Sequence, residues 1–135
     1  MTKGEEGRLL MEEAKIAKQH SHSPYSKFRV GAALRCADGT IVRGCNIENA
    51  SFGLTNCAER VAIQTAVARG QRAFTGLAIA GDSLGPCMPC GACRQVMVEF
   101  DIDCVYLEAQ DGSIICYTLE DLLPKSFGPK AMNKE

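Results

Sequence analysis

Three cysteines and one glutamate occur at spacings that suit metal chemistry. Glu59 follows Cys57 by two residues, and Cys90 and Cys93 form a Cys-x-x-Cys pair directly after Pro89. Each segment opens a stretch with the composition of a buried helix, and the helix dipole and free backbone N–H groups at such a start favour the thiolate. Thiolates are good zinc ligands, and three protein ligands leave a fourth tetrahedral position open for water. The spacing therefore predicts a catalytic zinc site.

Glu59 is not needed as a fourth ligand in this arrangement. A carboxylate two residues from a ligand lies beside the open position, where it can move protons between the zinc-bound water and a substrate. Cys-x-Glu combined with a downstream Pro-Cys-x-x-Cys is far more specific than a Cys-x-x-Cys pair alone. The residues predict hydrolytic chemistry with Glu59 as the general acid and base.

Other interpretations of the eight cysteines remain open. Cys87 lies three residues before Cys90, so that Cys57, Cys87, Cys90 and Cys93 could form a closed, structural four-cysteine zinc module without catalysis, which leaves Glu59 unexplained. A redox role for the Cys-x-x-Cys pair would not explain Cys57. A disulfide framework is not expected, because the N-terminal residues lack the apolar region of a secretory signal. The remaining cysteines are expected to be small buried residues on strands: Cys36, Cys45, Cys104 and Cys116.

Helices over 57–69 and 90–100 must position these residues. Hydrophobic periodicity and turn signals predict a further amphipathic helix over 6–19 and a last helical turn over 119–123. Strands are predicted over 28–36, 40–45, 75–80, 103–108 and 113–117. Because helices connect some of these strands and hairpins connect others, we expect residues 1–135 to form a single α/β domain with a mixed central sheet.

The charge balance restricts the class of partner. The chain has 15 basic and 16 acidic residues, a net charge of −1 and 46% hydrophobic residues. A protein that binds a phosphate backbone needs a basic stripe or patch, and a membrane protein needs a long apolar run. Neither feature is present, so we expect a cytoplasmic protein with a small-molecule substrate and no nucleic-acid or membrane partner.

The sequence resembles the small, one-domain cytidine deaminases over nearly its whole length. The segments that carry the resemblance are Phe-Arg-Val-Gly-Ala-Ala at 28–33, Gly-Cys-Asn-Ile-Glu-Asn-Ala at 44–50, Asn-Cys-Ala-Glu-Arg at 56–60, Pro-Cys-Gly-Ala-Cys-Arg-Gln at 89–95 and the tail at 122–129. The resemblance implies a three-layer α/β/α sandwich with about five strands. It also implies a hydrolase of cyclic amidine C–N bonds, which converts cytidine and 2'-deoxycytidine to uridine and 2'-deoxyuridine with release of ammonia, in pyrimidine salvage.

The same resemblance assigns roles at the metal site. Cys57, Cys90 and Cys93 would hold one Zn²⁺ per chain, and Glu59 would be the catalytic acid and base. Three thiolates on Zn²⁺ sum to one negative charge, which makes a bound water less acidic. We expect Arg60 to donate to the thiolate sulfurs and so to restore that acidity.

Further residues match positions that contact the nucleoside in this family. Asn46 and Glu48 would hydrogen-bond the ribose, and the ring of Phe28 would cover one face of the base. Ala58 is small enough for its backbone N–H to approach the base carbonyl.

The resemblance also implies an assembly. The small cytidine deaminases are homotetramers with active sites at subunit interfaces. Phe52 and Phe127 match positions that reach the pocket of a neighbouring subunit, although plain hydrophobic packing would also explain them.

Other deaminases share the zinc motifs. A blasticidin-type antibiotic deaminase has the Cys-Ala-Glu and Pro-Cys-x-x-Cys segments but lacks the Asn-x-Glu-Asn loop found here at 46–49. Deaminases that act on nucleic acid must hold a phosphate backbone, for which this chain has no excess positive charge. A free cytosine nucleoside is therefore the expected substrate.

Overall fold

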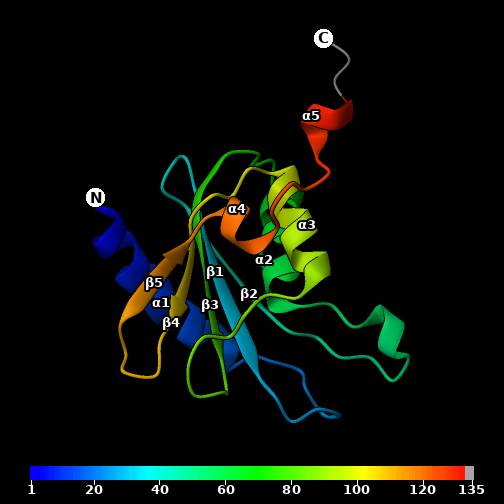
Figure 1. The fold of residues 1–135 in the computed structure, drawn as a ribbon. Helices are drawn as coiled ribbons and strands as arrows, with labels where there is room; N and C mark the ends of the chain where they lie inside the picture. Colours follow the sequence, from blue (N-terminus) through cyan, green and yellow to red (C-terminus); the bar gives the residue numbers. More distant parts are fainter. Residues whose placement is uncertain (133–135) are drawn as a thin grey trace.

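A computed structural model describes residues 1–132, and its strands form one five-stranded sheet in the order β2-β1-β3-β4-β5 (Figure 1). Strands β3 and β4 run parallel, and the other neighbours are antiparallel. The predicted mixed sheet is therefore confirmed. The strands are β1 (Val30–Cys36), β2 (Ile41–Cys45), β3 (Phe74–Gly81), β4 (Val105–Glu108) and β5 (Ile114–Tyr117).

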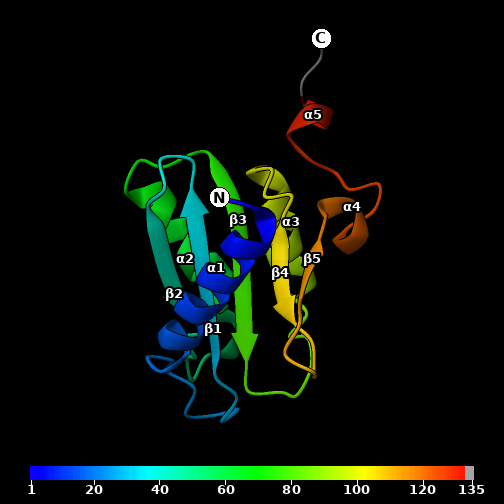
Figure 2. The ribbon, with the colours of Figure 1, turned by 90° about the vertical axis from the view of Figure 1, so that its left-hand side faces the viewer.

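Helices cover both faces of this sheet. Helix α1 (Lys3–Lys18) packs on one face, and α2 (Ala58–Ala68) and α3 (Gly91–Glu99) pack on the other, as the two views in Figures 1 and 2 show. This arrangement confirms the three-layer sandwich. The short helical segments are η1 (Phe52–Leu54), α4 (Leu119–Leu122) and α5 (Pro129–Met132).

Helix α1 begins three residues before the predicted start. Thr2 and Glu5 form a reciprocal capping box, in which the Glu5 backbone N–H donates to Thr2 Oγ1 at 3.1 Å and the Thr2 backbone N–H donates to Glu5 Oε1 at 3.2 Å. Such a box satisfies two backbone donors that a helix start leaves free. Periodicity alone missed it, because the residues before position 6 include no apolar residue of the buried stripe.

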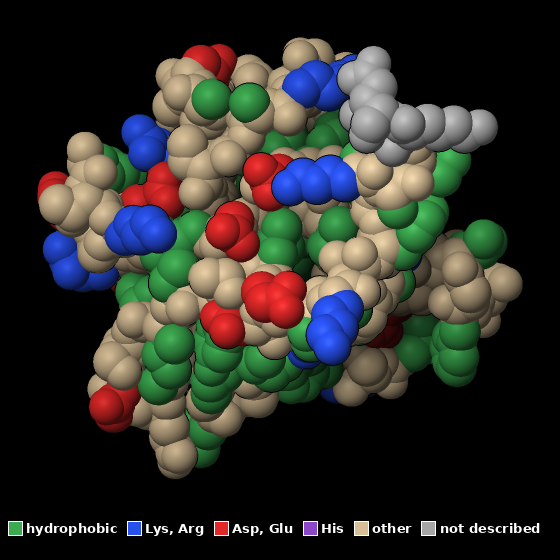
Figure 3. Space-filling view, turned by 45° about the horizontal axis from the view of Figure 1, so that its top comes forward, with side chains coloured by type: hydrophobic (Ala, Val, Ile, Leu, Met, Phe, Trp, Pro, Cys, Tyr) green, Lys and Arg blue, Asp and Glu red, His purple; other side chains and the backbone are tan. Residues whose placement is uncertain are grey.

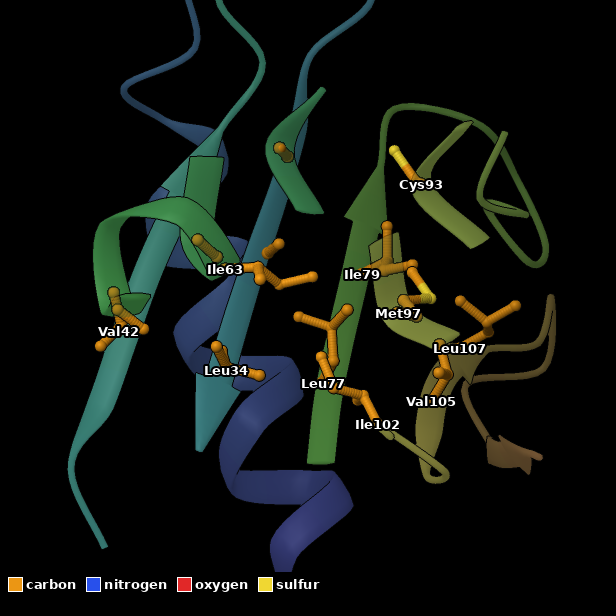
Figure 4. Packing of buried hydrophobic residues seen from close by; sticks show 14 of the residues in the cluster. Leu34, Val42, Ile63, Leu77, Ile79, Cys93, Met97, Ile102, Val105 and Leu107 are labelled. Carbon is orange, nitrogen blue, oxygen red and sulfur yellow. The ribbon is translucent and has the colours of Figure 1, made fainter. Parts of the chain in front are cut away.

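Each face of the sheet carries its own hydrophobic cluster. The larger cluster lies between the sheet and helices α2 and α3, and Figure 4 shows Cys93 at its edge. Its side chains come from all three of these elements, among them Leu34, Ile63, Leu77, Ile79 and Met97. The smaller cluster lies beneath α1 and contains Leu10, Met11, Ala14, Ala33, Ala78, Cys104 and Tyr106. Packing in the larger cluster therefore holds Cys93 in place.

A glycine sets the position of α2 on the sheet. A Cβ atom on Gly44 of β2 would lie 2.5 Å from the Ala58 carbonyl oxygen and 2.5 Å from the Ala62 backbone nitrogen. Only a residue without a side chain allows the backbones of strand and helix to approach so closely. This contact fixes the N-terminal turn of α2, which carries Cys57 and Glu59.

The four cysteines predicted to lie on strands do not all have the expected environment, and Cys104 lies just before β4 and not within it. Cys36 and Cys104 are buried, Cys45 is half-buried and Cys116 is exposed. The expectation of four buried thiols is wrong for Cys116 and only partly met by Cys45, because β5 and β2 are the edge strands of the sheet.

The surface shows how the charged residues are distributed, and the helices show whether the chain could cross a membrane. Acidic and basic side chains are interspersed among apolar ones on the face that Figure 3 presents, and neither sign dominates it. Within residues 1–132, none of the helices combines the length and the apolar character needed to cross a membrane.

Candidate active site

Three cysteine side chains meet where α2 and α3 begin. Cys57 is the N-cap of α2, Cys90 is the N-cap of α3, and Cys93 lies in the first turn of α3. Their Sγ atoms all lie within 4.8 Å of one another, with 3.8 Å between Cys57 and Cys90 and 3.4 Å between Cys90 and Cys93. Around a tetrahedral zinc ion with Zn–S bonds of about 2.3 Å, sulfur atoms are about 3.8 Å apart. The geometry of the three thiols fits zinc.

The ionisation of these thiols also favours a cation. Hydrogen bonds from Cys93 and Arg60 lower the pKa of Cys57 to about 5. The Cys57 thiolate, together with burial, raises the pKa of Cys93 far above its usual range. The thiols therefore oppose one another's ionisation, and all three become thiolates only with a positive ion between them. Soft thiolate donors of this kind select zinc over calcium or magnesium.

Glu59 lies in the first turn of α2, two residues after Cys57, and its side chain is buried at 4% exposure. Burial raises the pKa of its carboxyl group, and the negative charge of Cys57 acts in the same direction. A carboxyl group with a raised pKa exchanges protons closer to neutral pH, which suits a general acid and base.

Arg60 points back toward the cysteines. Its Nη2 donates to Cys57 Sγ at 3.3 Å, and its Nε is buried without a hydrogen-bond partner in the part of the chain that the structure describes. The thiolates raise the pKa of the guanidinium, which therefore stays charged. A fixed positive charge at this place draws negative charge from the sulfurs.

Cys87 does not join the three cysteines. Its Sγ is outside the group that meets at the helix starts, and the side chain packs against the end of β3, where a Cβ atom on Gly81 would lie 2.6 Å from it. Burial raises the pKa of the Cys87 thiol to about 11. A neutral thiol outside the group gives no support to a closed site of four cysteines.

Asn46 orders the segment that carries Phe28. Its Nδ2 donates to the Phe28 carbonyl at 2.9 Å, and its Oδ1 accepts from the Val30 backbone N–H at 3.0 Å and from Ser21 Oγ. The amide therefore ties two chain segments together besides any contact with a ligand. No sequence signal indicated this function, because the partners lie 16 to 25 residues away.

Glu48 has a similar second task. Its carboxylate accepts from the backbone N–H groups of Tyr25 and Ser26 at 3.0 Å each and from Ser26 Oγ. The Ser26 contacts lower the pKa of the Glu48 carboxyl group, so that it stays ionised. Glu48 and Phe52 line one hollow of about 380 Å³ with Tyr25, Ser26 and Thr55.

The predicted intersubunit residues are exposed. The Phe52 side chain is 73% exposed and packs edge-on against Tyr25, with ring centroids 5.9 Å apart. Phe127 is 63% exposed, although Gln95 Nε2 of α3 donates to its carbonyl at 2.8 Å. The backbone is held on α3 while the ring faces outward. In a single chain both rings therefore present apolar surface to solvent.

Phe28 is half-buried and Ala58 is buried beside Cys57, at the start of α2. The structure adds an ion pair that sequence reasoning missed next to Phe28. The Arg29 guanidinium and backbone N–H donate to Asp82 at 2.8 to 3.1 Å, and Lys18 Nζ lies 3.2 Å from the same carboxylate. Arg29 holds the pKa of Asp82 at about 2. These contacts fix the loop after β3 against the Phe28 segment.

The chain is similar to several proteins of named function. A family model described as the cytidine and deoxycytidylate deaminase zinc-binding region matches residues 5–109, which include the three cysteines and Glu59. Cytidine deaminases of Sporosarcina psychrophila and Halalkalibacterium halodurans are each 48% identical to this chain. The first match covers 92% of this chain and 93% of the relative, and the second covers 93% and 97%.

Structures and a more distant relative extend this comparison. A crystal structure of cytidine deaminase from Burkholderia pseudomallei superposes with a TM-score of 0.84 at 47% identity, and the match covers 89% of this chain and 98% of that chain. A blasticidin-S deaminase of Bacillus cereus is 32% identical over 76% of this chain and 79% of the relative. The antibiotic deaminase is thus the more remote of these relatives.

Proposed function

The chain belongs to the cytidine and deoxycytidylate deaminase family, and from this premise we propose how its own residues carry out the reaction. It is a hydrolytic enzyme of zinc-dependent cytidine deamination, with one Zn²⁺ per chain. The observation that carries the proposal is the group of three thiols with buried Glu59 beside it. Cys57, Cys90 and Cys93 hold the ion, and Arg60 balances their charge.

Glu59 moves the protons in this reaction. When bound, the zinc ion would act as a Lewis acid that lowers the pKa of water, so that water becomes a nucleophile near neutral pH. Glu59 takes one proton from the attacking water and delivers it to N3 of the cytosine ring. After the oxygen has added to C4, Glu59 passes the second proton to the amino group, which leaves as ammonia and gives uridine. The raised pKa of the buried carboxyl group suits both transfers.

Four residues orient the nucleoside. The Asn46 amide has two N–H donors, and one of them remains for a ribose hydroxyl after the bond to Phe28. The ionised Glu48 carboxylate accepts from a second hydroxyl. Phe28 offers its ring to one face of the base, and the Ala58 backbone N–H, at the start of α2, donates to the base carbonyl.

The finer description of the enzyme is also a proposal. It acts on 2'-deoxycytidine as well as cytidine, serves pyrimidine salvage in the cytoplasm as one domain over residues 1–135, and assembles as a homotetramer. The outward rings of Phe52 and Phe127 support the assembly, because each subunit would then cover apolar surface that is exposed in a single chain. Matches over more than nine-tenths of this chain and of its relatives support the single domain.

A substrate panel tests the proposal and its alternative. Blasticidin S is a second candidate substrate, because the Bacillus cereus relative is a blasticidin-S deaminase. We expect zinc-loaded protein to release ammonia from cytidine and 2'-deoxycytidine, and to leave free cytosine and blasticidin S unchanged, because only the nucleosides present ribose hydroxyls to Asn46 and Glu48. Ammonia release from the antibiotic but not from the nucleosides would contradict the proposal.

The closed four-cysteine module is tested separately. Cys87→Ala is expected to keep one zinc per chain and full turnover, because its thiol lies outside the group of three. Loss of zinc from this variant would support the closed site.

A further inference from the structure

Two cysteines outside the active site lie against each other on β4 and β5. Cys104 directly precedes β4 and Cys116 lies within β5, and their Sγ atoms are 2.6 Å apart. The strand register explains this contact. Tyr106 pairs with Cys116, and Cys104 shares the face of Tyr106 because alternate residues of a strand point the same way. The two thiols are therefore diagonal neighbours on the face of the sheet that α1 covers.

The two thiols differ in their access to solvent. Cys104 is only 5% exposed and belongs to the cluster beneath α1, whereas Cys116 is exposed. Cys116 also lines a hollow of about 320 Å³ whose lining includes Lys3, Arg8 and Ser113. A small solute can reach Cys116 through this hollow but not Cys104. The two cations favour a solute that carries negative charge.

We propose that Cys104 and Cys116 form a thiol–disulfide exchange site that a small anionic disulfide oxidises, with Cys116 as the attacking thiol and Cys104 as the resolving thiol. The site is distinct from the zinc site, because the zinc ligands lie at the starts of α2 and α3 on the opposite face of the sheet. The proposal does not depend on the deaminase reaction.

The exchange proceeds in two steps. The Cys116 thiolate attacks one sulfur of the small disulfide, whose S–S bond breaks and releases one thiolate, and a mixed disulfide remains on Cys116. The Cys104 thiolate then attacks the Cys116 sulfur and releases the second small thiolate. Two protein thiols lose two electrons and two protons, and one small disulfide is reduced to two thiols.

The surroundings make this exchange slow at neutral pH. Burial and the neighbouring Cys104 raise the pKa of the Cys116 thiol to about 12, Asp103 acts in the same direction, and Lys3 opposes them. Few Cys116 side chains are therefore thiolates at neutral pH, and an incubation must last for hours. The product ties the edge strand β5 to β4 and is expected to raise the thermal midpoint by roughly 5–10 °C, because it closes a short loop of the unfolded chain.

Oxidised glutathione, a disulfide that carries carboxylates, is the probe for the experiment. Zinc-loaded protein is incubated with it, the remaining thiols are alkylated under denaturing conditions, and the digest is analysed by mass spectrometry. We expect one linked pair of peptides that contains Cys104 and Cys116 and is lighter by two hydrogens than the sum of the reduced peptides. Reduction of this bond should remove the gain in thermal midpoint.

Two variants and a matched control make the result specific. Cys104→Ser is expected to stop at a glutathione adduct on Cys116, and Cys116→Ser, which changes an exposed residue, is expected to show neither the adduct at 116 nor the link. Cys45→Ser, a change at a half-buried strand cysteine, should still form the link. The proposal is overturned if wild-type Cys104 remains a free thiol, or if links form only among the zinc ligands as zinc is released.

Discussion

At the scale of single residues, the main feature of the site is the negative charge that three cysteines and Glu59 bring close together. Three thiols, which become thiolates when they hold a cation, lie with a buried carboxyl group at the starts of two helices, and the side-chain cation that donates to this group within residues 1–132 is Arg60. The helix dipoles and this guanidinium together lower the cost of holding negative charge close to the buried side chains of Cys93 and Glu59.

The first prediction concerns Arg60. Arg60→Ala removes the donor to Cys57 and leaves more negative charge on the sulfurs, so the water at the metal becomes less acidic. Arg60 also lowers the pKa of Cys57, so without it protons compete better with the metal for this sulfur. We expect zinc affinity to fall by about 10- to 100-fold and the acidic limb of the pH–rate profile to move to higher pH. Zinc competition with a chelator and kcat/KM measured against pH check this.

An exposed arginine provides the control for that experiment. Arg43 pairs with Glu13 on the surface, away from the cysteines, and Arg43→Ala should change neither quantity. Full zinc occupancy together with an unchanged pH profile in Arg60→Ala would show that Arg60 does not tune the site.

The sequence predicted the zinc-site residues better than the surroundings of the nucleoside pocket. Cys57 and Glu59 lie close together in the chain at the start of one helix, so their spacing alone predicts a metal ligand with a carboxyl group beside it. The bonds of Asn46 to Phe28 and of Glu48 to Ser26 join segments 18 and 22 residues apart. No local pattern contains such contacts, because the fold alone brings these residues together.

At the scale of the elements, the position of α2 on β2 decides where the site residues lie. The second prediction follows from Gly44, whose added Cβ would meet the backbone of α2 at 2.5 Å. Gly44→Ala forces strand and helix apart and is expected to lower the free energy of unfolding by about 1–3 kcal/mol, as overpacking does. Because Cys57 and Glu59 start this helix, activity should fall as well. Urea unfolding and steady-state kinetics on zinc-loaded protein check both effects.

A second Gly→Ala change separates this clash from the general effect of the substitution. Gly4 lies in α1, where the nearest atom to an added Cβ is the end of the Arg8 side chain at 3.6 Å. Gly4→Ala should stabilise the protein by about 0.5–1 kcal/mol, since alanine favours helices over glycine. Equal behaviour of the two variants would refute the close-packing argument.

The third prediction concerns the contact between Asp82 and the Phe28 segment. Arg29 lowers the folded-state pKa of Asp82 to about 2, below the usual value of 3.8. The ion pair therefore adds stability above pH 4, and this stability is lost as the pH falls through 2. Asp82→Asn should lower the thermal midpoint above pH 4, and its difference from wild type should shrink as the pH falls further. A difference that is constant from pH 6 to pH 3 would contradict the assignment.

The elements themselves were largely predictable, and their ends were less so. Apolar periodicity and turn residues located the five strands and the three long helices. The start of α1 depended on the capping box of Thr2 and Glu5, a local polar signal that periodicity does not contain. Helix α5 was not predicted, because the four residues from Pro129 are too few for a periodic pattern.

At the scale of the whole molecule, the exposed rings of Phe52 and Phe127 are the feature that bears on the proposed assembly. The fourth prediction is that the enzyme is a tetramer in solution and that Phe127→Ala raises KM for cytidine without lowering the thermal stability of the single-chain fold, because the ring is 63% exposed. Light scattering coupled to kinetics measures both. Leu84→Ala, a change at an exposed residue of the loop after β3, is the control and should leave KM unchanged. A fully active monomer would contradict the assembly.

The layered architecture followed from the order of helices and strands, but the order of strands in the sheet did not. The parallel pairing of β3 with β4 depends on α3 crossing the sheet between them, and the sequence does not state which strands become neighbours. The resemblance to a known family implied three layers and about five strands, and the structure supplied the strand order.

The most direct test of the central claim counts zinc and ammonia in the same samples of wild type and Glu59→Gln. The three thiols bind the metal without Glu59, so both proteins should carry about one zinc per chain. Only wild type should release ammonia from cytidine, because the amide of glutamine cannot move the protons. Turnover by Glu59→Gln at the wild-type rate, or zinc-loaded wild type that leaves cytidine unchanged, would contradict the account.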